Sequence, residues 1–160
     1  MSPATVRDLL VLTTAFSGFL AGASADRYLV QVPAWRHLDV MTWAEHSRHA
    51  DLGNGRFWYP LLAFGTTGVS IAVAIGVRAG TLVVAGVALP VYLAGSFSTV
   101  GLALTVFAAP QLLRLRNPQD QPTTVRSFLL FHRWGLARAA FQIIAFPINL
   151  WALWVLARFS

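Results

Sequence analysis

The stretch FHRWGLARAAFQIIAFPINLWALWVLARF, residues 131–159, decides the fold class of this chain. Between residues 134 and 157 it contains a single charged side chain, that of Arg138. With its one charge, this run of 24 residues is longer than the roughly 20 residues that a helix needs to cross the hydrocarbon of a bilayer. The sequence therefore predicts a membrane-spanning helix at this end of the chain.

The same stretch carries three polar residues, Arg138, Gln142 and Asn149. On a helix these positions lie within about 40° of one another. Polar side chains in a span usually face protein or a cavity, because lipid offers them no hydrogen bonds. We expect the stripe to face the inside of a bundle and to bond across helices. Arg138 has an alternative, since it lies close enough to the apolar boundary to reach the headgroups.

The composition favours an integral membrane protein. Of the 160 residues, 56% are hydrophobic and 11% are charged, whereas a soluble domain usually has about 25% charged residues. All 12 basic residues are arginines, and the net charge is +6. No dense basic block with interleaved aromatic residues occurs, so nucleic-acid binding is not expected. The absence of cysteine excludes disulfides and thiolate chemistry.

Four apolar runs predict an all-α, four-helix membrane bundle that forms a single transmembrane domain over residues 1–160. A short interfacial helix at 38–50, with Asp39 as its N-cap, is expected in the first loop. Pro33 is expected to break any helix that continues from the first span. The spans are expected at about 9–25, 57–77, 81–109 and 134–157, with polar loops at 26–56 and 111–126.

Arginine placement predicts the orientation in the membrane. The two long loops and their borders carry Arg27, Arg36, Arg48, Arg56, Arg114, Arg116, Arg126 and Arg133, and the other side carries Arg7, Arg78 and Arg158. Positively charged loops stay in the cytoplasm, so both termini are expected outside, and we expect the membrane to be the bacterial cytoplasmic membrane. The first apolar run also resembles a signal peptide, but we expect it to remain as a span. Gly18 and Gly22 form a GxxxG pair that permits close packing within the bundle or in a homo-oligomer.

Two groups near the membrane boundary are candidate bases. Asp26, at the end of the first span, can pair with Arg138 or Arg133, and a desolvated carboxylate there can accept a proton. His132, at the start of the last span, is expected to approach the same region. The alternatives are an interfacial ion pair for Asp26 and an interfacial anchor for His132.

A third candidate group lies in the polar loop. Glu45 and His49 are four residues apart and share a helix face, so Glu45 can orient His49 as a general base. With His46, the same residues form a weak alternative metal site. An ordinary solvated helix explains the pattern equally well. We expect no metal and no cofactor.

The fourth span, together with a third span that ends AAPQLLRLRNP and a long loop after the first, resembles the anthrone-oxygenase-like family of small membrane proteins. The similar element is Trp134-x3-Arg138, after a polar segment. Members commonly carry a histidine between this Trp and Arg, where the present chain has residues 135–137, Gly-Leu-Ala. The resemblance implies a four-helix bundle that oxidises anthrone-type polyketides to anthraquinones with O₂ and without a redox cofactor.

Such chemistry needs a base, a cationic group for the resulting anion and an apolar pocket. In this reading Asp26 or His132 is the base and Arg138 stabilises the anion. The expected substrate-binding residues are Gln142, Asn149, Tyr92, Trp134 and Tyr59. If the protein is an enzyme, Arg138, Asp26 and His132 should converge on a closed pocket.

Two other functions stay open at this point. The same acid–base groups suit a membrane isomerase or cyclase that acts on an apolar, terpenoid-like substrate. A non-enzymatic membrane protein that binds lipid or a partner protein also fits the sequence. In all three cases the surrounding membrane lipid is an expected partner.

Overall fold

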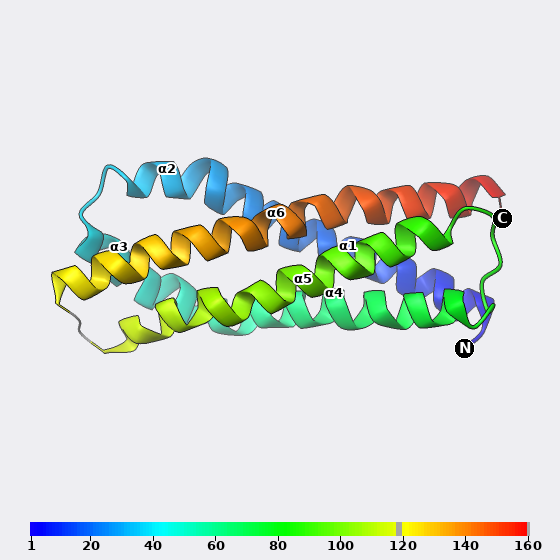
Figure 1. The fold of residues 1–160 in the computed structure, drawn as a ribbon, viewed down its shortest axis with the longest axis horizontal. Helices are drawn as coiled ribbons and strands as arrows, with labels where there is room; N and C mark the ends of the chain where they lie inside the picture. Colours follow the sequence, from blue (N-terminus) through cyan, green and yellow to red (C-terminus); the bar gives the residue numbers. More distant parts are fainter. Residues whose placement is uncertain (118–119, 160) are drawn as a thin grey trace.

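The computed structural model describes residues 1–117 and 120–159, apart from the side chain of Phe159. Its four long helices lie side by side, and the N- and C-termini are at the same end of the bundle (Figure 1). The described residues contain no β-strand. The expected all-α four-helix bundle is confirmed.

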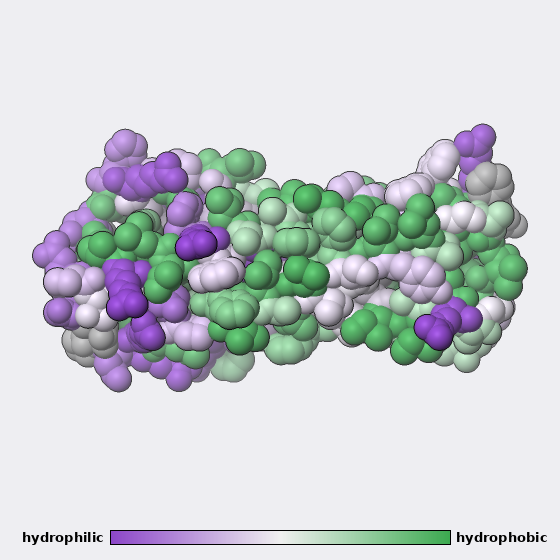
Figure 2. All heavy atoms as spheres, in the orientation of Figure 1, coloured by the Kyte–Doolittle hydropathy of each residue, from purple (hydrophilic) through white to green (hydrophobic). Residues whose placement is uncertain are grey.

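The long helices are α1 (Pro3–Asp26), α4 (Gly55–Arg78), α5 (Ala88–Leu113) and α6 (Gln121–Phe159). Each belongs to a helical segment that is long and apolar enough to cross a membrane. Figure 2 shows hydrophilic residues gathered at the end away from the termini, with mostly hydrophobic residues along the rest of the bundle. The chain is an integral membrane protein, and the side that its termini face stays a prediction.

The connection between α1 and α4 is largely helical. A π-helical turn, η1 (Arg27–Gln31), continues α1 into the short helix α2 (Val32–Trp35). After it come the interfacial helix α3 (Val40–His49) and a second π-helical turn, η2 (Ala50–Asn54), which leads directly into α4.

Two local predictions in this connection have different outcomes. Asp39 caps α3 by accepting a hydrogen bond of 2.9 Å from the backbone N–H of Met41, so the predicted helix and its N-cap are confirmed. The expected break at Pro33 is wrong. Pro33 lies in the first turn of α2, directly after the π-helical turn η1, and the chain stays helical through it.

The third helix begins later than the sequence suggested. Its first residue is Ala88, whereas the apolar run begins near residue 81. Gly80 and Gly86 have φ values of +70° and +81°, which most other residues avoid, and they shape the connection between α4 and α5. The connection is therefore longer than the three residues expected between the second and third spans, and α4 and α5 are antiparallel neighbours.

The second polar loop is much shorter than expected. Pro110 does not end α5, which continues to Leu113 and then into a 3₁₀ turn, η3 (Arg114–Arg116). Helix α6 begins at Gln121, so the polar residues before the apolar run form its first turns. Polarity indicates where a segment meets water, but a polar segment can be helix as well as loop.

Helix α6 packs against α5 and α1, and α4 packs against the same two helices. Near the termini, an apolar cluster that includes Val6, Leu10 and Val73 fills the interior. A Cβ atom at Gly18 would lie 3.0 Å from Phe146 of α6, whereas Gly22 has no neighbour within 4 Å. Thus Gly18 of the GxxxG pair serves packing inside the bundle.

Gly76→Ala is expected to destabilise the bundle by about 1–3 kcal/mol, because added volume in a packed core forces its neighbours to shift. The new Cβ would lie 2.6 Å from Cγ2 of Val6, which is fully buried and stiff at χ1. Thermal unfolding in detergent measures the effect. Gly68→Ala on the same helix is the control, since Gly68 has no neighbour within 4 Å. Equal melting temperatures for the two variants would contradict the packing.

Candidate active site

A buried ion pair lies at the polar end of the bundle. The guanidinium of Arg27, in η1, donates a hydrogen bond to Oδ1 of Asp51, in η2, and another of 3.1 Å to the Tyr59 hydroxyl. Arg27 is 6% exposed and Asp51 is 5% exposed. Charges are buried at this level only when they are paired, because an isolated ion loses its hydration. The pair joins the end of α1 to the start of α4.

Aromatic rings surround the same guanidinium. Its central carbon lies 5.0 Å from the ring centre of Tyr59, 5.8 Å from that of Phe131 and 6.0 Å from that of Trp35. Cations are attracted to the faces of aromatic rings at such distances. Because the rings come from α4, α6 and α2, Arg27 is a point where several elements of the polar end meet.

A second cation lies beside this pair. Arg138 of α6 is half-buried and close enough to Tyr28, Arg27 and Asp51 to interact with them electrostatically. Two arginines and one carboxylate leave one positive charge in excess. No acid lies within 4 Å of the Arg138 guanidinium in the described part of the chain. The stripe on the last span therefore faces protein at this position, as expected.

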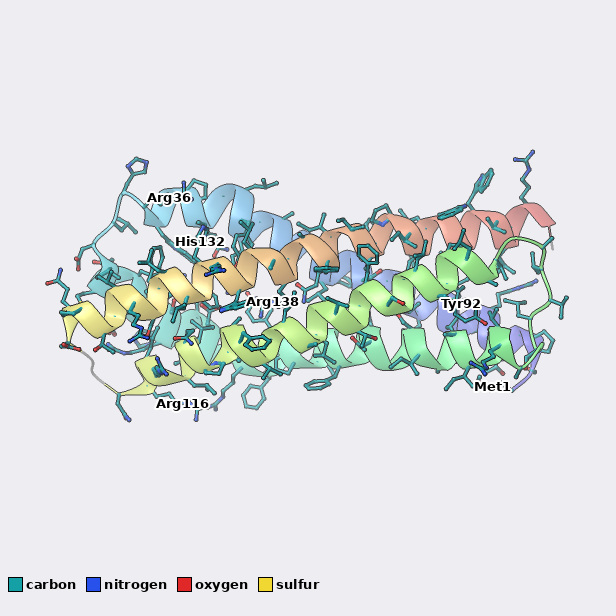
Figure 3. All side chains as sticks on the ribbon, viewed as in Figure 1. Met1, Arg36, Tyr92, Arg116, His132 and Arg138 are labelled. Carbon is teal, nitrogen blue, oxygen red and sulfur yellow. The ribbon has the colours of Figure 1, made fainter. Side chains whose placement is uncertain are left out.

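Among the buried polar atoms that have no hydrogen-bond partner in residues 1–117 and 120–159, four belong to residues around the ion pair. They are the Tyr28 hydroxyl, Nδ1 of His132, Nε of Arg138 and Oδ2 of Asp51. The rings of Tyr28 and His132 are 5.9 Å apart. Buried polar groups without partners each cost about 1–3 kcal/mol, so a cluster of them is a candidate ligand site. Figure 3 shows His132 and Arg138 on the polar half of α6.

The expected contact between Asp26 and Arg138 is wrong. Asp26 is exposed and accepts a hydrogen bond of 2.5 Å from Nε2 of Gln31. Successive residues on a helix point about 100° apart, so the inward position belongs to Arg27. The carboxylate beside Arg138 comes instead from Asp51. An arginine buried at the end of the first span needs an acid, and Asp51 is the last acid before the second span.

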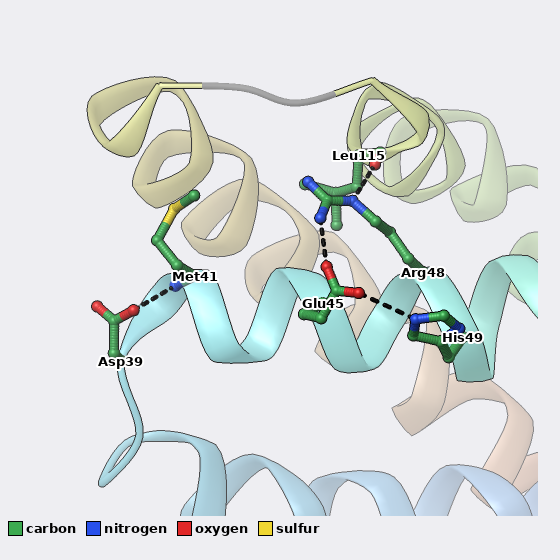
Figure 4. A network of polar contacts seen from close by, with 6 residues as sticks. All are labelled: Asp39, Met41, Glu45, Arg48, His49 and Leu115. Atoms are coloured by element: carbon green, nitrogen blue, oxygen red, sulfur yellow. Dashed lines mark hydrogen bonds and ion pairs between the residues drawn. The ribbon is translucent and has the colours of Figure 1, made fainter.

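Glu45 and His49 lie on the surface (Figure 4). Oε1 of Glu45 is 2.9 Å from Nε2 of His49, while Arg48 donates hydrogen bonds to Glu45 and to the backbone oxygen of Leu115. The network links α3 to η3, and the His49 side chain is 81% exposed. These residues share a face, as expected, but they lie outside the polar cluster, the buried group formed by Arg27, Tyr28, Asp51, His132 and Arg138.

The weak metal alternative has no support in the geometry. Among the described residues, no three His, Asp or Glu side chains are arranged so that they could hold a metal ion. The His46 ring lies 5.9 Å from the Trp35 ring, whereas His49 bonds Glu45.

Gln142 and Asn149 bond across helices, as expected, and their partners lie on α1. Gln142 accepts a hydrogen bond of 2.7 Å from Ser24, and Asn149 donates one of 3.2 Å to Ser17. All four side chains are buried, so this part of the stripe forms inter-helix bonds.

The remaining predicted substrate-binding residues are dispersed. Tyr59 contacts the polar cluster, through its bond with Arg27. Trp134 stacks on Phe107 of α5, with 4.8 Å between ring centres. Tyr92 is exposed, lines an open groove between α4 and α5, and lies toward the other end of the bundle (Figure 3).

Comparisons with protein-family models, with curated proteins and with solved structures give no match for this chain. The resemblance to the anthrone-oxygenase-like family stays a prediction from the residues named above.

Proposed function

We propose that the protein is a membrane enzyme that removes a proton from an apolar small molecule and stabilises the resulting anion. The observation that carries this proposal is that His132 Nδ1, Tyr28 Oη and Arg138 Nε are buried and have no hydrogen-bond partner in the described part of the chain. One of them is a natural proton acceptor and two are hydrogen-bond donors. Together they supply the groups that general acid–base chemistry needs.

In this proposal His132 is the base. A neutral imidazole nitrogen accepts a proton readily near neutral pH. Asp51 is a weaker candidate, although its Oδ2 has no partner among the described residues, because its ion pair with Arg27 favours the charged carboxylate and makes it a weaker base. The Arg27–Asp51 pair is a positioning element that holds η1, the turn that contains Tyr28, against η2.

Tyr28 and Arg138 stabilise the anion. The phenol O–H and the guanidinium N–H groups donate to the oxygen on which negative charge develops, and such fixed donors are most effective away from water. The substrate therefore has an acidic hydroxyl or an enolisable carbonyl on a large apolar body that partitions into lipid.

The finer version of the proposal is an oxygenation without a redox cofactor. The deprotonated substrate reacts with O₂, so that a CH₂ group becomes a carbonyl and water is the second product. Support for this version is the resemblance carried by Trp134 and Arg138. An isomerase or cyclase would use the same groups without O₂.

Anthrone is a suitable probe, because its conversion to anthraquinone changes its absorbance. We expect the purified protein in lipid nanodiscs to accelerate the conversion above empty nanodiscs in air, and to lose this activity without O₂. His132→Gln should lower the rate by about 10²–10⁴-fold, the usual contribution of a general base. His37→Gln, in an exposed loop, is the matched control and should leave the rate unchanged.

Three other results would redirect the proposal. No acceleration by the wild-type protein would overturn the oxygenase version. Conversion of a ketone or polyene probe without O₂ would favour the isomerase or cyclase. Tight binding of anthrone with no conversion would favour a protein that only binds anionic amphiphiles, a function that the excess positive charge near Arg138 also supports.

Gly135→Ala is expected to reduce activity through Tyr28. A Cβ atom at Gly135 would overlap the Tyr28 hydroxyl, so the ring has to move away from α6. We expect a loss of about 10²-fold or more, as for removal of one fixed donor. Gly22→Ala is the control, because nothing lies within 4 Å of the added atom. If both variants keep full activity, Tyr28 has no part in the site.

A further inference from the structure

A small polar cavity lies in the middle of the bundle, where α1, α4, α5 and α6 meet. Its volume is about 10 Å³, and its polar lining consists of Ser17, Thr66, Thr67, Ser98 and Gln142. A cavity needs on the order of 10–15 Å³ to hold one water molecule, and only polar cavities are normally filled. The volume and the lining both match a single water molecule.

Two of the lining hydroxyls lack partners. Thr66 of α4 is 2% exposed and Ser98 of α5 is 6% exposed, and neither hydroxyl oxygen has a hydrogen-bond partner in the part of the chain that the structure describes. Leaving both unbonded at membrane depth would be costly, because lipid cannot satisfy them. Each hydroxyl can donate one hydrogen bond and accept others.

The other polar groups of the lining already have bonds. Ser17 donates to the backbone oxygen of Thr14 and accepts from Asn149, and Gln142 accepts from Ser24. Thr67 donates a long bond of 3.3 Å to the backbone oxygen of Ser98. The vacant hydrogen-bonding capacity is therefore concentrated on Thr66 and Ser98.

We propose that this cavity binds one water molecule, which bridges the Thr66 and Ser98 hydroxyls and joins α4 to α5 at the centre of the bundle. Buried waters typically make about three hydrogen bonds, and the side-chain amide of Gln142 at the cavity wall supplies a further polar group. A metal cation does not suit the site, since no carboxylate lines it and an unpaired ion at this depth is costly. The proposal is independent of the proposed enzyme activity.

The shape-conserving substitution Thr66→Val tests the proposal by the sign of its effect. If a water molecule is bonded to the Thr66 hydroxyl, the variant removes one of the hydrogen bonds of that buried water. We then expect the melting temperature in nanodiscs to fall by about 2–4 °C. If the cavity is dry, the variant removes an unsatisfied hydroxyl and the melting temperature rises. Ser98→Ala should behave as Thr66→Val does.

A control and a direct readout complete the test. Thr99→Val removes an exposed hydroxyl from α5 that bonds only within its own helix, and it should leave the melting temperature within about 1 °C. Solid-state NMR of the wild-type protein in bilayers should show magnetisation transfer from water to Ser98, and the Thr66→Val/Ser98→Ala variant should lose it. A rise in melting temperature in Thr66→Val, or no transfer in the wild-type protein, overturns the proposal.

Discussion

Asp51→Ala is expected to lower the free energy of unfolding by about 3–5 kcal/mol, the usual cost of removing one partner from a buried ion pair. The change leaves the Arg27 guanidinium without its carboxylate in a site that water barely reaches, next to the Tyr59 hydroxyl and aromatic faces. Because Arg27 and Asp51 hold η1 against η2, the polar end should loosen before the helices separate. Thermal and denaturant unfolding in detergent measure the loss.

Two further variants serve as controls for Asp51→Ala: one breaks an exposed ion pair, and the other removes both charges of the buried pair. Glu45→Gln breaks an ion pair with Arg48 on the surface and should have a much smaller effect, since exposed pairs contribute little. Arg27→Met combined with Asp51→Leu removes both charges, and it should recover most of the stability that Asp51→Ala loses. If Asp51→Ala is as mild as Glu45→Gln, water reaches Arg27 and the pair is not a buried one.

The sequence predicted the features of the fold that depend on local signals. The long apolar runs predicted four helices, and Asp39 before residue 40 predicted the N-terminus of α3. The two boundaries of α5 and the first residue of α6 could not be predicted from hydropathy. An apolar run shows which part of a helix contacts lipid or core, and it does not show where the helix begins or ends. The first turns of α6 are polar and still helical, whereas the connection between α4 and α5 is apolar and not helical.

In the candidate site, too, the features that depend on local spacing could be predicted and those that depend on contacts between elements could not. The inward position of Arg138, Gln142 and Asn149 follows from their spacing on one helix, and all three face protein in the structure. The Arg27–Asp51 pair could not be predicted in this way. Its members lie in different elements, and their directions depend on two π-helical turns that leave no clear pattern in the sequence.

Arg138→Met is expected to raise stability while it abolishes activity. Asp51, the carboxylate that interacts electrostatically with Arg138, is paired with Arg27, and Nε of Arg138 has no hydrogen-bond partner among the described residues. Replacing a partly buried charge that has no close carboxylate with an apolar side chain of similar length should stabilise the protein by about 1 kcal/mol, the low end of the range for fully buried ion pairs. Activity should fall by about 10²–10³-fold, as for the loss of one preorganised donor to an oxyanion. Opposite changes in stability and activity are typical of residues kept for function.

The direction of the stability change separates the two roles of Arg138. If its guanidinium only reaches headgroups, or holds Tyr28 and Asp51 in place, Arg138→Met removes a favourable interaction and the melting temperature falls. If the guanidinium is kept for a bound anion, the empty protein gains stability and loses the ability to hold anthrone. Arg133→Met is the matched control, because Arg133 is exposed and lies over the Trp134 ring at 5.6 Å. It changes the charge of α6 by the same amount, five residues away, and should leave both quantities nearly unchanged.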